Sequence, residues 1–226
     1  DVRAEPFDDP RVRRAVALAL DRARIAAALG GSWGPATGLV PDGVPGARPG
    51  VCKACTHDPA QAKALAAAGS PFTLTVPDDP VDRRIAALAV ADLGKAGLDA
   101  RVDPVDPERY LTRLRRPGLQ AFALAWTADH QRQDAFLFPQ FAAAGRDNLT
   151  HFRNPAVYRL LTQARATADD PARIALSQQA EDALLAQLPA VPVLWQRHAA
   201  ALAPGLRGFD LTPQGVVDLA EVSLEN

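Results

Sequence analysis

The fold is decided by the stretch PFTLTVPDDPVDRRIAALAVADLGKAGLDARVDPVDPERYLTRLRRPGLQAFALAW, residues 71–126. Three β-rich runs alternate in it with two amphipathic ones: strands over 72–76, 98–105 and 121–126, and helices over 80–96 and 107–116. Apolar residues recur at three- and four-residue spacing in the helical runs, as on one face of a helix. This doubled βαβ pattern predicts an α/β fold with a mostly parallel sheet, right-handed crossovers and flanking helices.

The predicted helix starts, inside this stretch and outside it, share one repeated signal, an Asx residue followed by proline. The Asx side chain can accept from free amides of the first turn, and proline suits the first helical position. The dipeptides are Asp9-Pro10, Asp58-Pro59, Asp79-Pro80, Asp106-Pro107, Asn154-Pro155 and Asp170-Pro171. Outside the central stretch they predict helices over 10–29, 59–68 (ended by Gly69), 155–167 and 171–188. Further strands are predicted over 191–195, 198–203 and 206–211, and residues 34–50 read as an irregular loop.

Composition indicates a globular chain. Of the 226 residues, 48% are hydrophobic and 23% charged, and the net charge of −1 gives no electrostatic footprint for nucleic acid. No apolar run approaches the roughly 18 residues that a membrane span needs. The chain begins at Asp1 and contains no Met, so we expect a processed product or an excised fragment.

Motifs for catalysis are weak. The sequence has no Gly-x-Ser-x-Gly elbow, no P-loop and no dinucleotide fingerprint, and its four histidines lack metal-ligand spacing. We therefore expect no catalytic residues, no cofactor and no metal site, and keep an α/β enzyme only as a minor alternative.

The two cysteines, Cys52 and Cys55, leave three alternatives open. They can form a small structural disulfide, remain as two thiols, or, with His57, supply three metal ligands. A redox motif is expected at a helix start after a strand, whereas this pair follows a Pro/Gly-rich loop.

The best candidate site follows the strand predicted over 121–126. Ligands of open α/β sheets bind outside the carboxyl ends of the strands. Trp126, Thr127, Asp129 and His130 place an aromatic ring, a hydroxyl, a carboxylate and an imidazole there. The alternative is that Trp126 belongs to the core and Asp129 caps the following helix.

Seven segments, in order along nearly the whole chain, carry a family resemblance. They are Pro6–Ala15 with Leu20–Arg22, Asp58–Gly69, Phe72–Val76 with the strand near Val102, Trp126–Asp129 with Phe136–Leu137, Asn154–Val157 with Leu160–Leu161, Val191–Leu194, and Gly205–Phe209. Together they resemble the second lobe of family 5 solute-binding proteins, the peptide and nickel receptors of ABC importers.

The resemblance implies a periplasmic-binding-protein-like lobe (type II) of a two-lobed receptor that closes on its ligand. Peptide-binding members hold the ligand's α-amino group with an Asp that matches Asp129, beside Trp126 and Thr127. His130 departs from the family, which usually has Tyr there. Nickel chelates, oligosaccharides and haem are other family ligands.

Family members are roughly twice this length, which sets the expected organisation. Residues 1–190 would be the ligand-binding lobe, and residues 191–226 would return as strands toward the hinge and the missing first lobe. The resemblance implies an extracellular or periplasmic protein, made with a signal peptide, anchored as a lipoprotein and working with a membrane permease. The alternative is the ligand-sensing domain of a bacterial transcriptional regulator.

Overall fold

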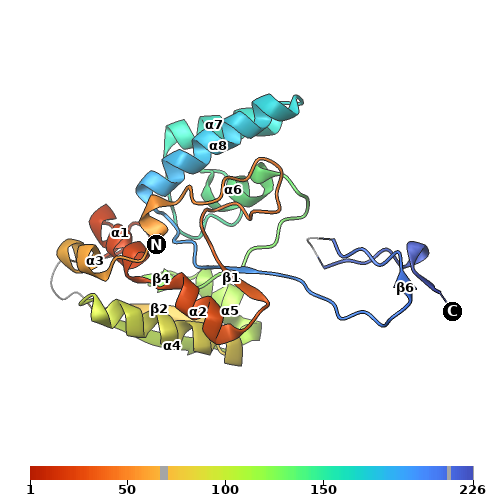
Figure 1. Ribbon diagram of the computed structural model, residues 1–226. Helices are drawn as coiled ribbons and strands as arrows, with labels where there is room; N and C mark the ends of the chain where they lie inside the picture. The colour runs from red at the N-terminus through yellow and green to blue at the C-terminus, as the bar shows by residue number, and fades with distance from the viewer. Residues whose placement is uncertain (67–70, 213–214, 226) are drawn as a thin grey trace.

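The computed structural model describes residues 1–66, 71–212 and 215–225 and contains a parallel three-stranded sheet (Figure 1). Its strands, in spatial order, are β3 (Ala100–Val105), β2 (Phe72–Pro77) and β4 (Ala121–Phe122). Both neighbours run parallel to β2, and α4 (Pro80–Lys95) and α5 (Pro107–Leu114) make the crossovers. The doubled βαβ order is confirmed, but the strand predicted over 121–126 is reduced to the two residues of β4. Antiparallel pairing occurs in separate two-stranded ribbons instead of in this sheet.

The Asx-Pro dipeptides start helices because the Asx side chains accept from first-turn amides. The residue before the proline caps α1 (Pro10–Ala19), α3 (Pro59–Leu65), α4, α5 and α7 (Pro155–Ala166). α8 (Asp170–Gln187) begins one residue early and is capped by Asp169. The predicted end of the second helix, at 68–69, lies outside the described residues. No helix in the described ranges is long and apolar enough to cross a bilayer.

The single helix predicted over 10–29 is wrong. The structure has α1 and a separate α2 (Arg22–Leu29), which ends at Gly30. Asp21 caps α2 by accepting from the Arg24 N–H at 2.9 Å, and its own N–H donates to the buried carboxylate of Asp92 in α4 at 3.0 Å. Because the helix is broken at this point, the Asp21 N–H has no helical carbonyl to bond, and the Asp92 carboxylate, 71 residues away, accepts from it instead.

Arg22 stabilises the break between α1 and α2. The residue is buried, with only 4% of its surface exposed. Its guanidinium donates to four carbonyls: Pro192 O at 2.7 Å, Ala17 O at 2.9 Å, Cys55 O at 3.0 Å and Leu20 O at 3.2 Å. Burial lowers the pKa of Arg22 to about 10, so it stays charged at neutral pH. One cation thus joins α1, the cysteine turn and the segment before the last strands.

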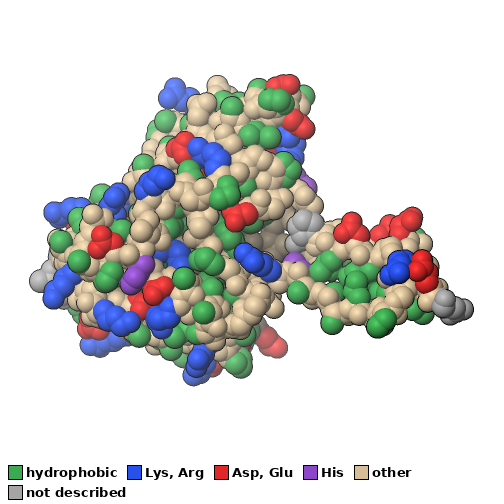
Figure 2. Space-filling model, viewed as in Figure 1, with side chains coloured by type: hydrophobic (Ala, Val, Ile, Leu, Met, Phe, Trp, Pro, Cys, Tyr) green, Lys and Arg blue, Asp and Glu red, His purple; other side chains and the backbone are tan. Residues whose placement is uncertain are grey.

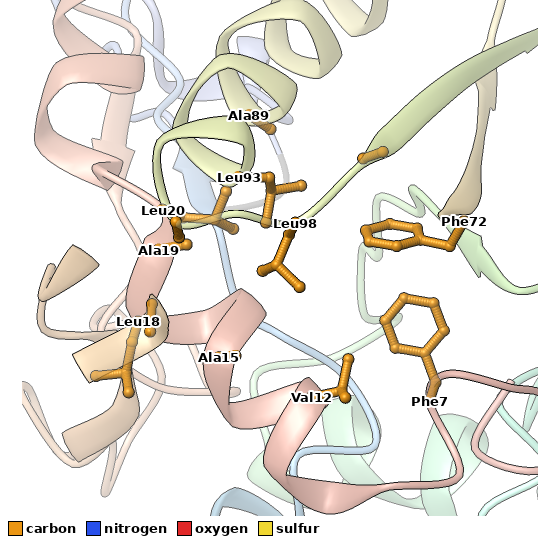
Figure 3. Close-up of a cluster of buried hydrophobic side chains, with 13 residues drawn as sticks. Phe7, Val12, Ala15, Leu18, Ala19, Leu20, Phe72, Ala89, Leu93 and Leu98 are labelled. Carbon is orange, nitrogen blue, oxygen red and sulfur yellow. The ribbon is translucent and has the colours of Figure 1, made fainter. Parts of the chain in front are cut away.

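The first hydrophobic core lies between α1, α4 and the sheet (Figure 3). The rings of Phe7 and Phe72 meet edge-to-face, with centroids 4.9 Å apart. Leu93 of α4 and Leu98 lie on the other side of the same cluster. This core seats the sheet on the N-terminal helices.

A second core forms between α7, α8 and α6 (Gln133–Phe141), and contains Leu137, Leu161 and Leu184. The sequence did not predict α6, because Pro139 lies inside it and proline discourages a helical assignment. The irregular loop after α2 packs on this core. Glu181 of α8 is 1% exposed and accepts from the N–H groups of Leu39 and Val40 at 3.0 and 3.2 Å.

Cys52 and Cys55 are joined in a disulfide that spans the short 3-10 turn η1 (Lys53–Cys55). Cys52 is buried and Cys55 half-buried. Within the described ranges no group of three or more His, Cys, Asp or Glu side chains is placed to hold a metal ion. The metal alternative with His57 therefore has no ligand set there.

The last segment pairs with the body once and then leaves it. β5 (Leu194–Gln196) is antiparallel to β1 (Trp33–Pro35). Residues 198–212 and 215–225 then form an extended arm with β6 (Leu206–Arg207), η2 (Leu219–Glu221) and β7 (Ser223–Leu224) (Figure 1). The strand predicted over 198–203 is wrong, and the one over 206–211 is reduced to β6. Strand-like residues form a ladder only beside a partner strand, which 198–203 lacks.

We expect Arg22→Met to lower the free energy of unfolding of this chain by at least about 3 kcal/mol, because it leaves buried carbonyls without donors. Urea unfolding measures the loss. Arg14→Met removes an exposed arginine of α1 and serves as the control, with an expected change within about 0.5 kcal/mol. Equal effects of the two substitutions would contradict the role given to Arg22.

Candidate ligand-binding site

The candidate site lies in the segment that leaves the sheet after β4. We call residues 123–130 the site segment. It crosses from the carboxyl end of β4 to the start of α6, and so from the first hydrophobic core to the second. Its first residue still belongs to the sheet, because the Ala123 N–H donates to Thr75 O of β2 at 3.0 Å.

Trp126 is held by a carbonyl of α6. Its indole N–H donates to Ala135 O at 3.1 Å. In a regular helix that carbonyl would accept from the N–H four residues later, but residue 139 is proline and has none. The ring is half-buried, so Trp126 is anchored at the surface and is not a core residue.

Asp129 has no structural partner among the described residues. Its side chain is exposed, and none of the hydrogen bonds or ion pairs of the described chain includes it. The alternative that Asp129 caps the following helix is wrong, because α6 begins at Gln133 after Arg132, without a side-chain cap. Thr127 and His130 are also exposed, whereas Ala128 between them is buried. The segment thus turns all three polar side chains of the candidate site toward solvent.

The start of α6 beside them is fixed by contacts that sequence reasoning missed. Arg132 Nε pairs with the buried carboxylate of Asp134 at 2.9 Å. Buried Gln133 donates to Pro45 O at 3.1 Å. Gly46, at φ +79°, is needed there because a Cβ would lie 2.5 Å from the Gln133 amide. No local sequence pattern predicts the contact between Gln133 and Pro45, because the two residues are 88 positions apart.

A hollow of about 550 Å³ opens where β2 ends, lined by Asp78, Asp79, Pro80, Arg83 and Arg84. Asp78 pairs with Arg83, and Asp79 is occupied as the cap of α4. Asp82, one turn into α4, is half-buried. Burial and a hydrogen bond with Asp79 raise the pKa of Asp82 to about 7, while the same bond lowers the pKa of Asp79.

The side chains of the candidate site suit the binding of a cation. An unpaired carboxylate can hold an ammonium group, and the ring of Trp126, three positions earlier, offers apolar surface. Thr127, Asp129 and His130 are exposed and Trp126 is half-buried, and the role of all four in binding stays a prediction.

The chain is similar to known binding proteins in sequence. Residues 1–148 match the family model "Bacterial extracellular solute-binding proteins, family 5 Middle". The chain is 28% identical over 239 residues to a dipeptide-binding protein of Escherichia coli, covering all of this chain and 44% of that protein. It is 27% identical over 231 residues to a probable di/tripeptide-binding protein 5 of Pseudomonas aeruginosa, covering 97% and 44%.

Solved structures give the same result. HbpA2 from Haemophilus parasuis superimposes with a TM-score of 0.93 at 26% identity, over 100% of this chain and 47% of that one. OppA of Burkholderia pseudomallei does so with a TM-score of 0.81 at 26% identity, over 99% and 47%. The chain therefore spans about half the length of the relatives it matches.

We expect Asp82→Asn to stabilise the chain more at pH 8 than at pH 5. The pKa of Asp82 is near 7 in the folded chain and 3.8 in a free carboxyl. The wild-type chain therefore loses stability as the pH rises from about 4 through 7, where Asp82 must ionise in the folded state. Asparagine carries no charge and can still donate to Asp79. Solvent screening at this half-exposed site limits the gain to about 1 kcal/mol, a rise in Tm of about 2–4 °C at pH 8.

Thermal melts at both pH values measure this effect. Asp42→Asn, in an exposed loop, is the control and should show no such pH dependence. A Tm shift for Asp82→Asn that is the same at pH 5 and pH 8 would show that Asp82 does not titrate in this window.

Proposed function

The chain belongs to the bacterial extracellular solute-binding proteins of family 5, and we propose that it is the ligand-holding lobe of an importer's receptor, which binds the amino end of a peptide without catalysis. One observation carries the proposal: the carboxylate of Asp129 is exposed and unpaired in the described structure, just past the carboxyl end of a parallel sheet. Relatives named for binding dipeptides and di/tripeptides support a peptide ligand. They also favour transport over the sensor alternative.

Recognition would begin with the ligand's charge. A peptide ammonium meeting Asp129 makes a charge-assisted hydrogen bond, which closure of the receptor would strengthen by excluding water. Trp126 would supply apolar contact beside it, and the Thr127 hydroxyl a polar contact. His130 would tune selectivity where relatives of the family usually carry a tyrosine.

The arm, residues 198–212 and 215–225, supports the proposal of a second lobe that is absent from this chain. Four large apolar side chains of the arm are strongly exposed: Leu202 at 48%, Val216 at 61%, Leu219 at 74% and Leu224 at 70%. Figure 2 shows hydrophobic side chains gathered on this arm, away from the main body. Apolar residues that gather at a surface in this way usually pack against a partner. We propose that residues 1–190 form the ligand-binding lobe and that residues 191–226 return to the hinge and pack on the first lobe.

The disulfide bears on the cellular setting. The Cys52–Cys55 disulfide fits an oxidising compartment outside the cytoplasm. We propose a periplasmic or extracellular receptor, anchored as a lipoprotein, that hands its ligand to a membrane permease.

In the full-length receptor, we expect Asp129→Asn to weaken binding of an unblocked dipeptide by about 10- to 150-fold, or about 1.5–3 kcal/mol, because the charge-assisted bond is lost. Isothermal titration calorimetry with Met-Leu as the probe measures the change. Asp99→Asn makes the same substitution at the amino end of β3, on the opposite edge of the sheet, and should leave Kd unchanged. If the wild-type receptor binds and Asp129→Asn binds equally well, Asp129 does not hold the amino group.

The 226-residue chain alone should bind the same dipeptide with millimolar or unmeasurable affinity. One lobe covers only one side of a small ligand, and receptors of this kind gain affinity by burying most of the ligand surface. Calorimetry on the isolated chain tests this, and micromolar binding would mean that a complete site already lies within residues 1–226.

A further inference from the structure

The ladder between β2 and β4 ends where a donor is missing. In a parallel ladder, one residue bonds to two residues of the facing strand. If its N–H donates to the carbonyl of residue j, its own carbonyl accepts from the N–H of residue j + 2. The Ala123 N–H donates to Thr75 O, so Ala123 O should accept from the N–H of residue 77. Residue 77 is proline, which has no N–H.

Tyr110 of α5 takes the vacant place. Its hydroxyl lies within hydrogen-bonding distance of Ala123 O and 3.1 Å from Thr75 O. Thr75 O already accepts from the Ala123 N–H, whereas Ala123 O has no other donor in the described parts of the chain. The single hydroxyl proton is therefore assigned to Ala123 O.

The surroundings of Tyr110 keep its hydroxyl in place and protonated. The residue is 5% exposed, packed with Leu114 and Leu119, and cannot exchange its partner for water freely. Burial, with a smaller contribution from Asp82, raises the pKa of the Tyr110 hydroxyl, so it remains a protonated donor at all physiological pH values.

We propose that Tyr110 is a positioning residue for the ligand site: its hydroxyl replaces the N–H that Pro77 lacks and fixes the point where the site segment leaves the sheet. The proposal rests on the proposed function for its consequence in binding. Three residues beyond Ala123, Trp126 is anchored to Ala135 O, the carbonyl that Pro139 leaves free. The site segment, which carries Asp129, is thus fixed at two places. At each place a side chain donates to a carbonyl that has no backbone donor because a proline stands where the N–H would be.

Hydrogen exchange on the 226-residue chain tests the geometry without any ligand. Tyr110→Phe should speed exchange of the Ala123 amide, the N–H of the site segment that donates a hydrogen bond in the described structure, by about tenfold, the effect of one lost hydrogen bond, and leave α7 and α8 unchanged. Adding Pro77→Ala restores a backbone donor facing Ala123 O, so the double variant should recover wild-type protection. Tyr158→Phe removes a hydroxyl that has no hydrogen bond in the described structure and is the control.

Dipeptide binding to the full-length receptor tests the consequence. With Met-Leu as the probe, Tyr110→Phe should weaken Kd about 5- to 20-fold, and Pro77→Ala in that background should restore it, whereas a residue that merely fills space would not be rescued by a backbone N–H. Unchanged exchange in Tyr110→Phe, or no rescue by Pro77→Ala, overturns the proposal. If the wild-type receptor fails to bind peptides while the exchange results hold, the proposed function is wrong but the role of Tyr110 in the segment stands.

Discussion

The hydrogen bonds between β2 and β4 stop at Pro77, because proline offers no N–H to the next carbonyl along the neighbouring strand. That missing donor decides where the chain leaves the sheet after Ala123. A second proline, Pro139, frees the carbonyl of Ala135 in α6, and the indole of Trp126 bonds to it. The exposed segment between these points is therefore an ordered connection, whose polar side chains face solvent from a fixed backbone.

Buried charges play a comparable part where the chain has no regular structure. Arg22 serves four carbonyls around the break between α1 and α2. Glu181 satisfies two amides of the loop after α2, and Asp92 accepts from the amide of Asp21. Each group bonds backbone atoms that secondary structure leaves unpaired, and this makes its burial tolerable.

Family membership and the arm point to the same organisation. The chain covers 44–47% of its relatives, and its last residues expose leucine and valine side chains away from the body. The proposed two-lobed receptor rests on these features, together with the exposed and unpaired carboxylate of Asp129 in the described structure.

The sequence alone determined what depends on neighbours within about four residues. Asx-Pro dipeptides set the helix starts, and alternating periodicities set the βαβ order, because caps and amphipathic faces are local. The position of the site segment after β4 followed from that order. Tertiary structure decided the break at Leu20–Asp21, helix α6 despite Pro139, the fate of residues 198–203 and the free state of Asp129. In each case the deciding partner, present or absent, is a group distant in sequence, which a local pattern cannot reveal.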